Sequence, residues 1–168
     1  MSDVTIRLAT QDDAGTIVRM ITELARQVGN TSERLVTEPQ LIAAMADARS
    51  ICTVLVAEDN SRVAGMVMYS VVFSTWRGTA GVYVMDLYID EPWRGQGLGP
   101  ELLRAAARAS AVAGCGYMLL DVDIGNTGAQ RFYDRMGFRE ISSDRRRVLE
   151  VEAFKDLIAE NHDEVTAH

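Results

Sequence analysis

Hydrophobic residues recur at helical spacing near the start of the chain. A short apolar stretch at Val4–Ala9 is typical of a strand, and Thr10 with Asp13 then forms a capping box, the usual signal for the start of a helix. The predicted helix turns its apolar face inward at every third or fourth position. That face comprises Ile17, Val18, Ile21, Leu24, Ala25 and Val28.

A second helix start lies at Thr37. Pro39 occupies the first turn, where its missing N–H does no harm, and Gln40 completes another capping pattern. Three β-branched, apolar runs follow and are separated by polar turns, so they predict antiparallel strands. These runs are Thr53–Ala57, Val63–Phe73 and Gly81–Ile89.

The second half of the chain continues the alternation. Pro100–Ala113 predicts a helix that stops at Gly114, and Tyr117–Val122 is apolar enough for a buried strand. The order predicts one α/β domain over residues 1–168, a mixed central sheet of about six to seven strands flanked by helices, and a polar tail from about residue 160. Its last predicted elements are a helix from Asn126 through Met136, short strands near Phe138–Glu140 and Arg147–Val151, and a helix from Ala153.

The composition of the chain limits the classes of molecule that it is expected to bind. Apolar residues make up 48% of the chain, and its net charge is −7, which leaves no basic footprint for nucleic acid. An acidic surface suits either a cationic small molecule or simple solubility. Cys52 and Cys115 lie far apart without metal or disulfide spacing, and no apolar run has membrane-spanning length. A cytoplasmic protein without a membrane partner is expected.

Histidine is confined to the polar tail, at His162 and His168. Ser-His-Asp and Cys-His nucleophile systems need a histidine inside the fold, as do most zinc and iron sites. Hydrolase and metalloenzyme chemistry is therefore disfavoured, and no metal is expected.

Glycines at positions 95, 97 and 99 lie between a predicted strand and a predicted helix. Backbone N–H groups in such a loop, with the positive end of the helix dipole, suit a pyrophosphate, and Arg94 can add a charged contact. A nucleotide-hydrolase loop would need Gly-Lys-Ser/Thr where this chain has Gly99-Pro100-Glu101. A dinucleotide fingerprint would need glycine or alanine at Pro100 or Leu102.

The loop matches Arg94-x-x-Gly97-x-Gly99, and a second motif follows as Asn126-x-x-Ala129-x-x-Phe132-Tyr133-x-x-x-Gly137-Phe138. With both motifs the chain resembles the GNAT superfamily of acetyl-CoA-dependent N-acetyltransferases. Within it, the chain is most similar to the spermidine/spermine (diamine/thialysine) branch. That similarity rests on Ile6-Arg7-x-Ala9-Thr10, Ile21-x-Glu23-Leu24-Ala25 and Gly65-x-x-Met68-Tyr69.

The resemblance implies acetyl-CoA as cosubstrate, bound along the third strand of the antiparallel set, the glycine loop and the Asn126 helix. In the family that strand splays away from Tyr117–Val122 and opens a slot for the coenzyme. The positions implied to bind it are Leu87, Tyr88, Ile89, Arg94, Gly95, Gln96, Gly97, Leu98, Gly99, Pro100, Asn126, Ala129, Phe132 and Tyr133. Pro100 removes one helix-start N–H that could otherwise reach a phosphate.

The resemblance also implies catalytic roles. The N–H of Leu87 would stabilise the developing oxyanion, and Tyr133 would protonate the departing thiolate. A lysine-like amine has a pKa of about 10.4 and must lose a proton before attack. Asp86, Asp121 and Asp123 are candidate bases, and each could equally be a structural hydrogen-bonding group.

The chain departs from the polyamine branch where that branch places carboxylates. Met85 precedes Asp86, Arg26-Gln27-Val28 follows the first helix's apolar motif, and Asp144 is followed by Arg145-Arg146-Arg147. A second ammonium would be left unpaired, which disfavours spermidine and spermine. The arginine run suits either a substrate carboxylate or solvent.

The hypothesis is therefore direct acetyl transfer to the primary amine of a small molecule, such as a diamine or an amino acid. An acyl-CoA-binding sensor without turnover and a protein or peptide N-acetyltransferase are the alternatives. A homodimer is expected by family analogy.

Overall fold

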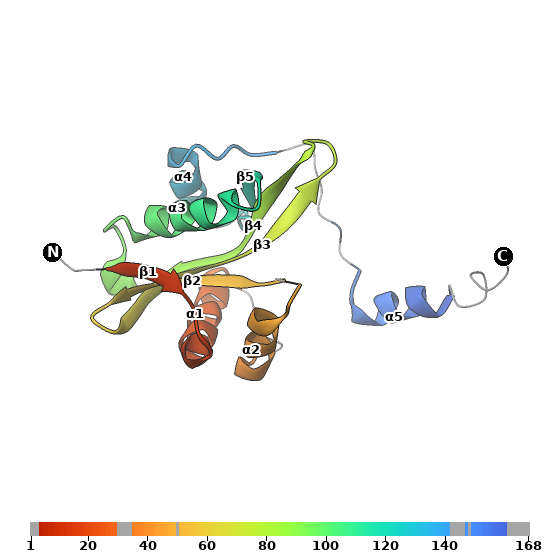
Figure 1. The fold of residues 1–168 in the computed structure, drawn as a ribbon, viewed down its shortest axis with the longest axis horizontal. Helices are drawn as coiled ribbons and strands as arrows, with labels where there is room; N and C mark the ends of the chain where they lie inside the picture. The colour runs from red at the N-terminus through yellow and green to blue at the C-terminus, as the bar shows by residue number, and fades with distance from the viewer. Residues whose placement is uncertain (1–3, 30–34, 50, 142–146, 148, 161–168) are drawn as a thin grey trace. The chain divides into compact units, whose positions relative to one another are not determined.

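The computed structural model describes residues 4–29, 35–49, 51–141, 147 and 149–160. The chain forms two compact units, Met1–Phe132 and Tyr133–His168. The first unit holds all five strands, and the second holds the end of one helix and all of the last (Figure 1). The expectation of a single domain over residues 1–168 stays a prediction.

The first unit is built on one sheet in the order β1-β2-β3-β4-β5. Neighbouring strands are antiparallel except β4 and β5, which are parallel. The strands are β1 (Thr5–Leu8), β2 (Thr53–Asp59), β3 (Arg62–Ser74), β4 (Thr79–Ile89) and β5 (Cys115–Leu120). This confirms a mixed α/β sheet and places the predicted strands where the apolar runs lie.

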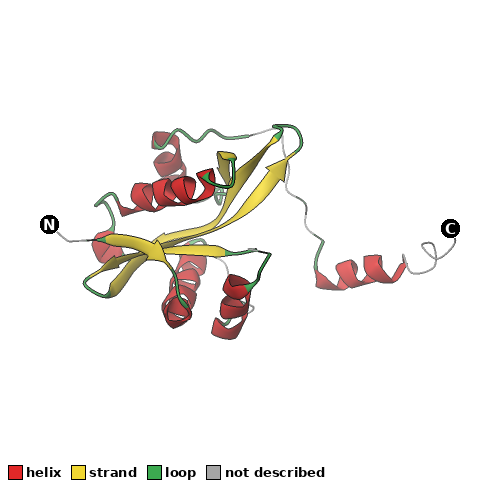
Figure 2. Ribbon diagram, viewed as in Figure 1, coloured by secondary structure: helices red, strands yellow, loops and turns green. Residues whose placement is uncertain are grey.

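Helices cover both faces of this sheet, as Figure 2 shows. Helices α1 and α2 lie on one face and α3 on the other. The helices are α1 (Ala14–Gln27), α2 (Glu38–Ala46), α3 (Leu98–Ala111), α4 (Thr127–Arg135) and α5 (Val151–Glu160), with short 3₁₀ turns at η1 (Gln11–Asp13) and η2 (Glu91–Trp93).

The predicted caps are present at the starts of the first two helices. The Asp13 carboxylate accepts hydrogen bonds from the backbone N–H and hydroxyl of Thr10, at 2.7 and 3.1 Å. Gln40 Oε1 accepts the same two groups of Thr37, at 3.0 and 2.9 Å. These contacts give polar groups at the start of each helix a hydrogen-bond partner only a few residues away. The start of each helix can therefore be predicted from the local sequence.

Each sheet face has its own apolar core. Ile17 and Met20 of α1 are fully buried and belong to a cluster with Val54, Met66 and Met68. Successive side chains of a strand point to opposite faces of the sheet. The residues next to Val54, Met66 and Met68 in the sequence therefore face α3. The apolar residues buried there include Leu55, Ala57, Val67, Leu102, Leu103 and Ala106.

The strand count is lower than expected: the structure has five strands in the described part of the chain, against the six to seven predicted. The predicted strand at Phe138–Glu140 is wrong, because those residues have no regular structure. Of the segment Arg147–Val151, Val148 lies outside the described residues, 147, 149 and 150 are irregular, and Val151 begins α5. A strand forms only when its backbone groups find a partner strand, and an apolar run cannot show whether that partner exists.

Candidate functional site

Strands β4 and β5 separate halfway along β4. Their last paired residues are Val84 and Leu120, whereas β4 continues beside β3 as far as Ile89. Met85 is the extra residue of a β-bulge, since Tyr69 faces Val84 and the preceding Met68 faces Asp86. Bulges re-aim side chains and end pairing. Within the described part of the chain, the segment Met85–Ile89 therefore lies beside a strand on one side only, which agrees with the expected splay.

The backbone of this segment presents polar groups to its unpaired side. The Asp90 N–H donates to Ala64 O at 2.9 Å, toward β3, whereas Ile89 O accepts from Arg94 Nε at 2.8 Å instead. Backbone groups alternate in direction along a strand. Leu87 is two residues before Ile89, so its N–H points away from β3. A donor for the oxyanion would be needed on this side of β4.

The Asp86 side chain lies on the sheet face covered by α1 and α2. It stands opposite Met68, which belongs to the same core cluster as Cys52. Burial raises the pKa of Asp86 above its ordinary value. Burial, and then the nearby Asp86 carboxylate, raise the pKa of the Cys52 thiol. Asp86 is thus a proton acceptor of raised basicity within a largely apolar setting.

The other candidate bases have structural partners. The Tyr83 hydroxyl donates to Asp121 Oδ2 at 2.7 Å, and the Gly125 N–H donates to Asp123 Oδ1 at 2.7 Å. Both carboxylates are exposed. Asp123 forms the tight turn that follows β5, a common local role for aspartate.

The glycine loop follows β4 directly. Gly95 and Gly97 have φ of 75° and 86°, in the left-handed region, and a Cβ added to either would meet no neighbouring atom within 4 Å. Gln96 Nε2 donates to Pro92 O at 2.7 Å, and the Arg94 guanidinium lies 5.5 Å from the centre of the Tyr88 ring. The loop therefore has an exposed, unobstructed backbone beside a cation.

Helix α3 begins at the end of this loop. Gly97 O accepts the Glu101 N–H at 3.2 Å as the first bond of the helix, and Pro100 has no N–H. The N–H groups of Leu98 and Gly99 therefore precede the helical ladder and are available to an anion. A Cβ at Gly99 would lie 3.2 Å from Phe132 Cζ, so this glycine lets the Phe132 ring approach the helix.

Asn126 caps α4, as expected from its position. Its Oδ1 accepts the Ala129 N–H at 3.0 Å, while its backbone oxygen accepts from Gln130 at 3.1 Å. In the second unit, the Tyr133 and Phe138 rings meet edge to face with centroids 5.4 Å apart. This ring contact packs the end of α4 against the segment that follows Gly137.

The positions that depart from the polyamine branch are only partly described. Met85 is exposed, and Arg26 forms an ion pair with Glu23 of its own helix. Asp144, Arg145 and Arg146 lie outside the described residues, and Arg147 is exposed.

One feature of the site was missed by sequence reasoning. Arg19 of α1 forms two parallel hydrogen bonds to the Asp90 carboxylate, Nη1 to Oδ1 at 3.0 Å and Nη2 to Oδ2 at 2.9 Å. The two residues are 71 positions apart. No local pattern signals such a pair, because each residue alone reads as an ordinary surface charge.

Comparison with known proteins identifies the class. A sequence profile described as the acetyltransferase (GNAT) family matches residues 17–138. The chain belongs to this family of acetyltransferases, whose cosubstrate is acetyl-CoA. The unpaired half of β4 and the glycine loop both lie within the matched range.

Individual relatives share much of the chain. Thialysine N-epsilon-acetyltransferase of Sus scrofa is 31% identical over 150 residues, covering 84% of this chain and 88% of the relative. The enzyme of the same name from Mus musculus has the same identity and coverage. An integron cassette protein from the mobile metagenome of V. cholerae has the same fold, with a TM-score of 0.75 and 22% identity over 94% of this chain and 98% of its own.

Two further observations concern the described residues alone. They contain no group of three or more His, Cys, Asp and Glu side chains arranged to hold a metal ion. None of their helices has the length and apolar character needed to cross a bilayer.

Proposed function

We propose that this acetyltransferase passes the acetyl group of acetyl-CoA directly to the primary amine of a small molecule. The observation that carries the proposal is the one-sided pairing of Met85–Ile89, which leaves a strand edge beside the glycine loop. An extended pantetheine arm can hydrogen-bond such an edge as an added strand would. The left-handed glycines and the start of α3 suit its pyrophosphate.

Bound acetyl-CoA supplies the acetyl group as a reactive thioester. The Leu87 N–H donates to the acetyl oxygen and stabilises the negative charge that develops there. Asp86 takes a proton from the acceptor ammonium, directly or through a water, so the free amine attacks the carbonyl carbon. As the C–S bond breaks, the Tyr133 hydroxyl gives a proton to the sulfur. The nitrogen of the new amide releases its second proton, which returns through water to the Tyr133 phenolate. Cys52 and Cys115 form no bond in this scheme.

The acceptor we propose is an amino acid or diamine with a terminal primary amine. Support comes from relatives named as thialysine N-epsilon-acetyltransferases and from an Arabidopsis thaliana relative named as an L-ornithine N5-acetyltransferase, 33% identical over 75 residues. On the face of α1 and α2, the Asp90 carboxylate is paired with Arg19, which leaves Asp86 as a carboxylate that could meet an ammonium, and Met85 adds no second anion. An acceptor with one ammonium near the reaction centre suits this charge better than a polyamine.

The test measures release of free CoA from acetyl-CoA with thialysine, lysine, ornithine, diamines, polyamines, aminoglycosides and short peptides. Tyr133→Phe should slow turnover by roughly 10²–10⁴-fold with the best acceptor and leave acetyl-CoA affinity nearly unchanged. Tyr117→Phe is the matched control, because it also removes one phenol hydroxyl, and it should retain full activity.

Other results of this test would contradict parts of the proposal. An unchanged rate in Tyr133→Phe would remove this residue from the mechanism. Tight acetyl-CoA binding without CoA release for any acceptor would favour a sensor, and activity on peptides alone would favour a protein N-acetyltransferase.

We further propose a cytoplasmic homodimer. Both cysteines are free thiols, which suits a reducing compartment. The dimer rests on family resemblance, and light scattering of the purified protein would test it.

A further inference from the structure

The Arg19–Asp90 ion pair, like that of Arg7 with Glu58, joins residues that are far apart in the sequence. Arg26, Arg49, Arg104 and Lys155 each bind a carboxylate within three positions along the chain. Arg19 joins the middle of α1 to Asp90, the residue that follows β4, and both of its hydrogen bonds are short and parallel. Bidentate pairs of this kind restrict orientation as well as distance.

Asp90 is the residue from which the coenzyme loop starts. It is 7% exposed, its N–H is bonded to Ala64 of β3, and its carbonyl accepts the Trp93 N–H at 3.0 Å to open the turn η2. Glu91 O then accepts the Arg94 N–H at 3.1 Å. The direction in which the chain enters the glycine loop is therefore set at Asp90.

Arg19 is well placed to hold that residue. Its neighbours Ile17 and Met20 are fully buried against the sheet, so the α1 backbone beneath Arg19 is anchored in the core. The Asp90 carboxylate raises the pKa of the Arg19 guanidinium, so the cation persists at every physiological pH.

We infer that Arg19 and Asp90 are positioning residues for coenzyme binding, and that they set the glycine loop in the orientation that receives the CoA pyrophosphate. The inference rests on the proposed role of that loop. Neither side chain needs to touch the coenzyme, because the pair acts through the backbone that runs from Asp90 into Arg94 and Gly95.

The test is the dissociation constant of CoA, measured by calorimetry on the full chain. Arg19→Met should raise it about tenfold, since small displacements of a binding loop are costly. Arg19→Lys keeps the charge but loses the fork and should fall between wild type and Arg19→Met. Arg26→Met is the matched control, because it removes an exposed arginine from the same helix, and it should bind CoA like wild type.

A second ligand separates positioning from general damage. Pantetheine lacks the pyrophosphate, so its affinity should change little in Arg19→Met while that of CoA falls. Equal losses for both ligands, or unchanged CoA affinity in a folded Arg19→Met variant, would overturn the inference. If Arg19→Met does not fold, the Arg19→Lys result decides in the same way. A wild-type protein that does not bind CoA would instead refute the proposed function.

Discussion

Asp86 brings a titratable carboxyl group into a largely apolar face of the sheet. Its pKa is raised by burial, so the folded state binds this proton more tightly than the unfolded chain does. The contribution of such a group to stability is complete below the unfolded pKa and declines as the pH rises through the folded one. Ionised Asp86 costs the fold stability, so a role in proton transfer explains this residue better than a role in packing.

Asp86→Asn should therefore stabilise the fold at pH 7, because the neutral amide avoids placing a charge in this setting. The difference in melting temperature between the variant and wild type should shrink toward zero as the pH approaches about 3. Thermal unfolding at several pH values measures this, with the exposed Asp12→Asn as control. A variant less stable than wild type at pH 7 would show that the carboxylate has a stabilising partner.

At the scale of elements, two glycines decide how strand and loop are shaped. A Cβ at Gly81 of β4 would lie 2.3–2.5 Å from ring atoms of Tyr117 on β5, whereas one at Gly116 would lie 3.5 Å from Thr79. The Tyr117 ring therefore occupies the space that a side chain on β4 would need. Gly97, by contrast, faces open space and is required for its backbone angle.

Gly81→Ala should destabilise the protein by about 1–3 kcal/mol, the usual cost of overpacking. Gly116→Ala is the matched control on the neighbouring strand and should cost less. Chemical denaturation of the two variants measures the difference. Equal losses would mean that the Tyr117 ring can move aside and that the contact is not what requires glycine.

Gly97→Ala should raise the dissociation constant of CoA, because an L-residue at φ 86° costs about 1–2 kcal/mol and shifts the loop. Gly78→Ala is the control, since Gly78 has φ 65° in the turn between β3 and β4 and also faces open space. Both variants should lose similar stability, but only Gly97→Ala should lose CoA affinity. Unchanged CoA binding in Gly97→Ala would argue against a pyrophosphate site here.

The elements that the sequence predicts are those whose signals are local. The caps at Thr10 and Thr37 and the glycine loop lie within a few residues of the structure they specify, so they were predictable. The bulge at Met85 and the Arg19–Asp90 pair depend on distant partners and were not. The strand expected at Phe138–Glu140 failed for the same reason, since an apolar run does not reveal its partner.

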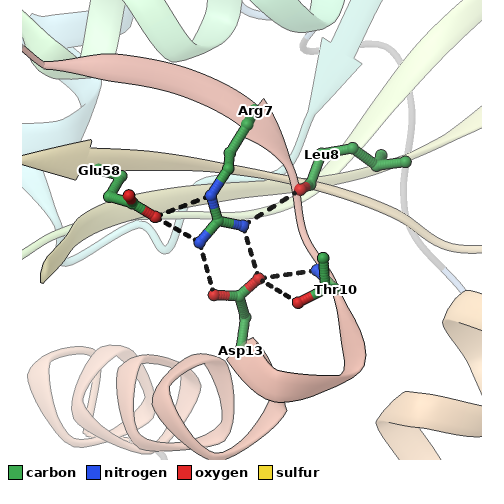
Figure 3. A network of polar contacts seen from close by, with 5 residues as sticks. All are labelled: Arg7, Leu8, Thr10, Asp13 and Glu58. Carbon is green, nitrogen blue, oxygen red and sulfur yellow. Dashed lines mark hydrogen bonds and ion pairs between the residues drawn. The ribbon is translucent and has the colours of Figure 1, made fainter. Parts of the chain in front are cut away.

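At the scale of the whole first unit, a polar network joins β1 both to the turn before α1 and to the more distant strand β2. Arg7 of β1 bonds the Asp13 carboxylate at 2.7 and 2.9 Å, before α1, and the Glu58 carboxylate on β2 (Figure 3). The Arg7 guanidinium, and the hydrogen bond from the Thr10 backbone, lower the pKa of Asp13 to about 2. The network therefore stabilises the fold while Asp13 is ionised.

Because the folded pKa of Asp13 is depressed, its contribution is complete above the unfolded value of 3.8 and is lost as the pH falls through about 2. We expect roughly 1–2 kcal/mol of stability to disappear in this window, allowing for the partial exposure of Arg7. Asp13→Asn should flatten the dependence of unfolding free energy on pH between 4 and 2, whereas Asp12→Asn should not. An unaltered slope in Asp13→Asn would refute the assignment.

The unpaired edge of β4 also affects whether the purified protein self-associates in solution. An open strand edge is a template on which a strand of another molecule can add, and proteins generally shield such edges. If the pantetheine arm occupies this edge, the coenzyme also acts as its shield. Purification without coenzyme would then favour slow edge-to-edge association, and added CoA would keep the sample monodisperse.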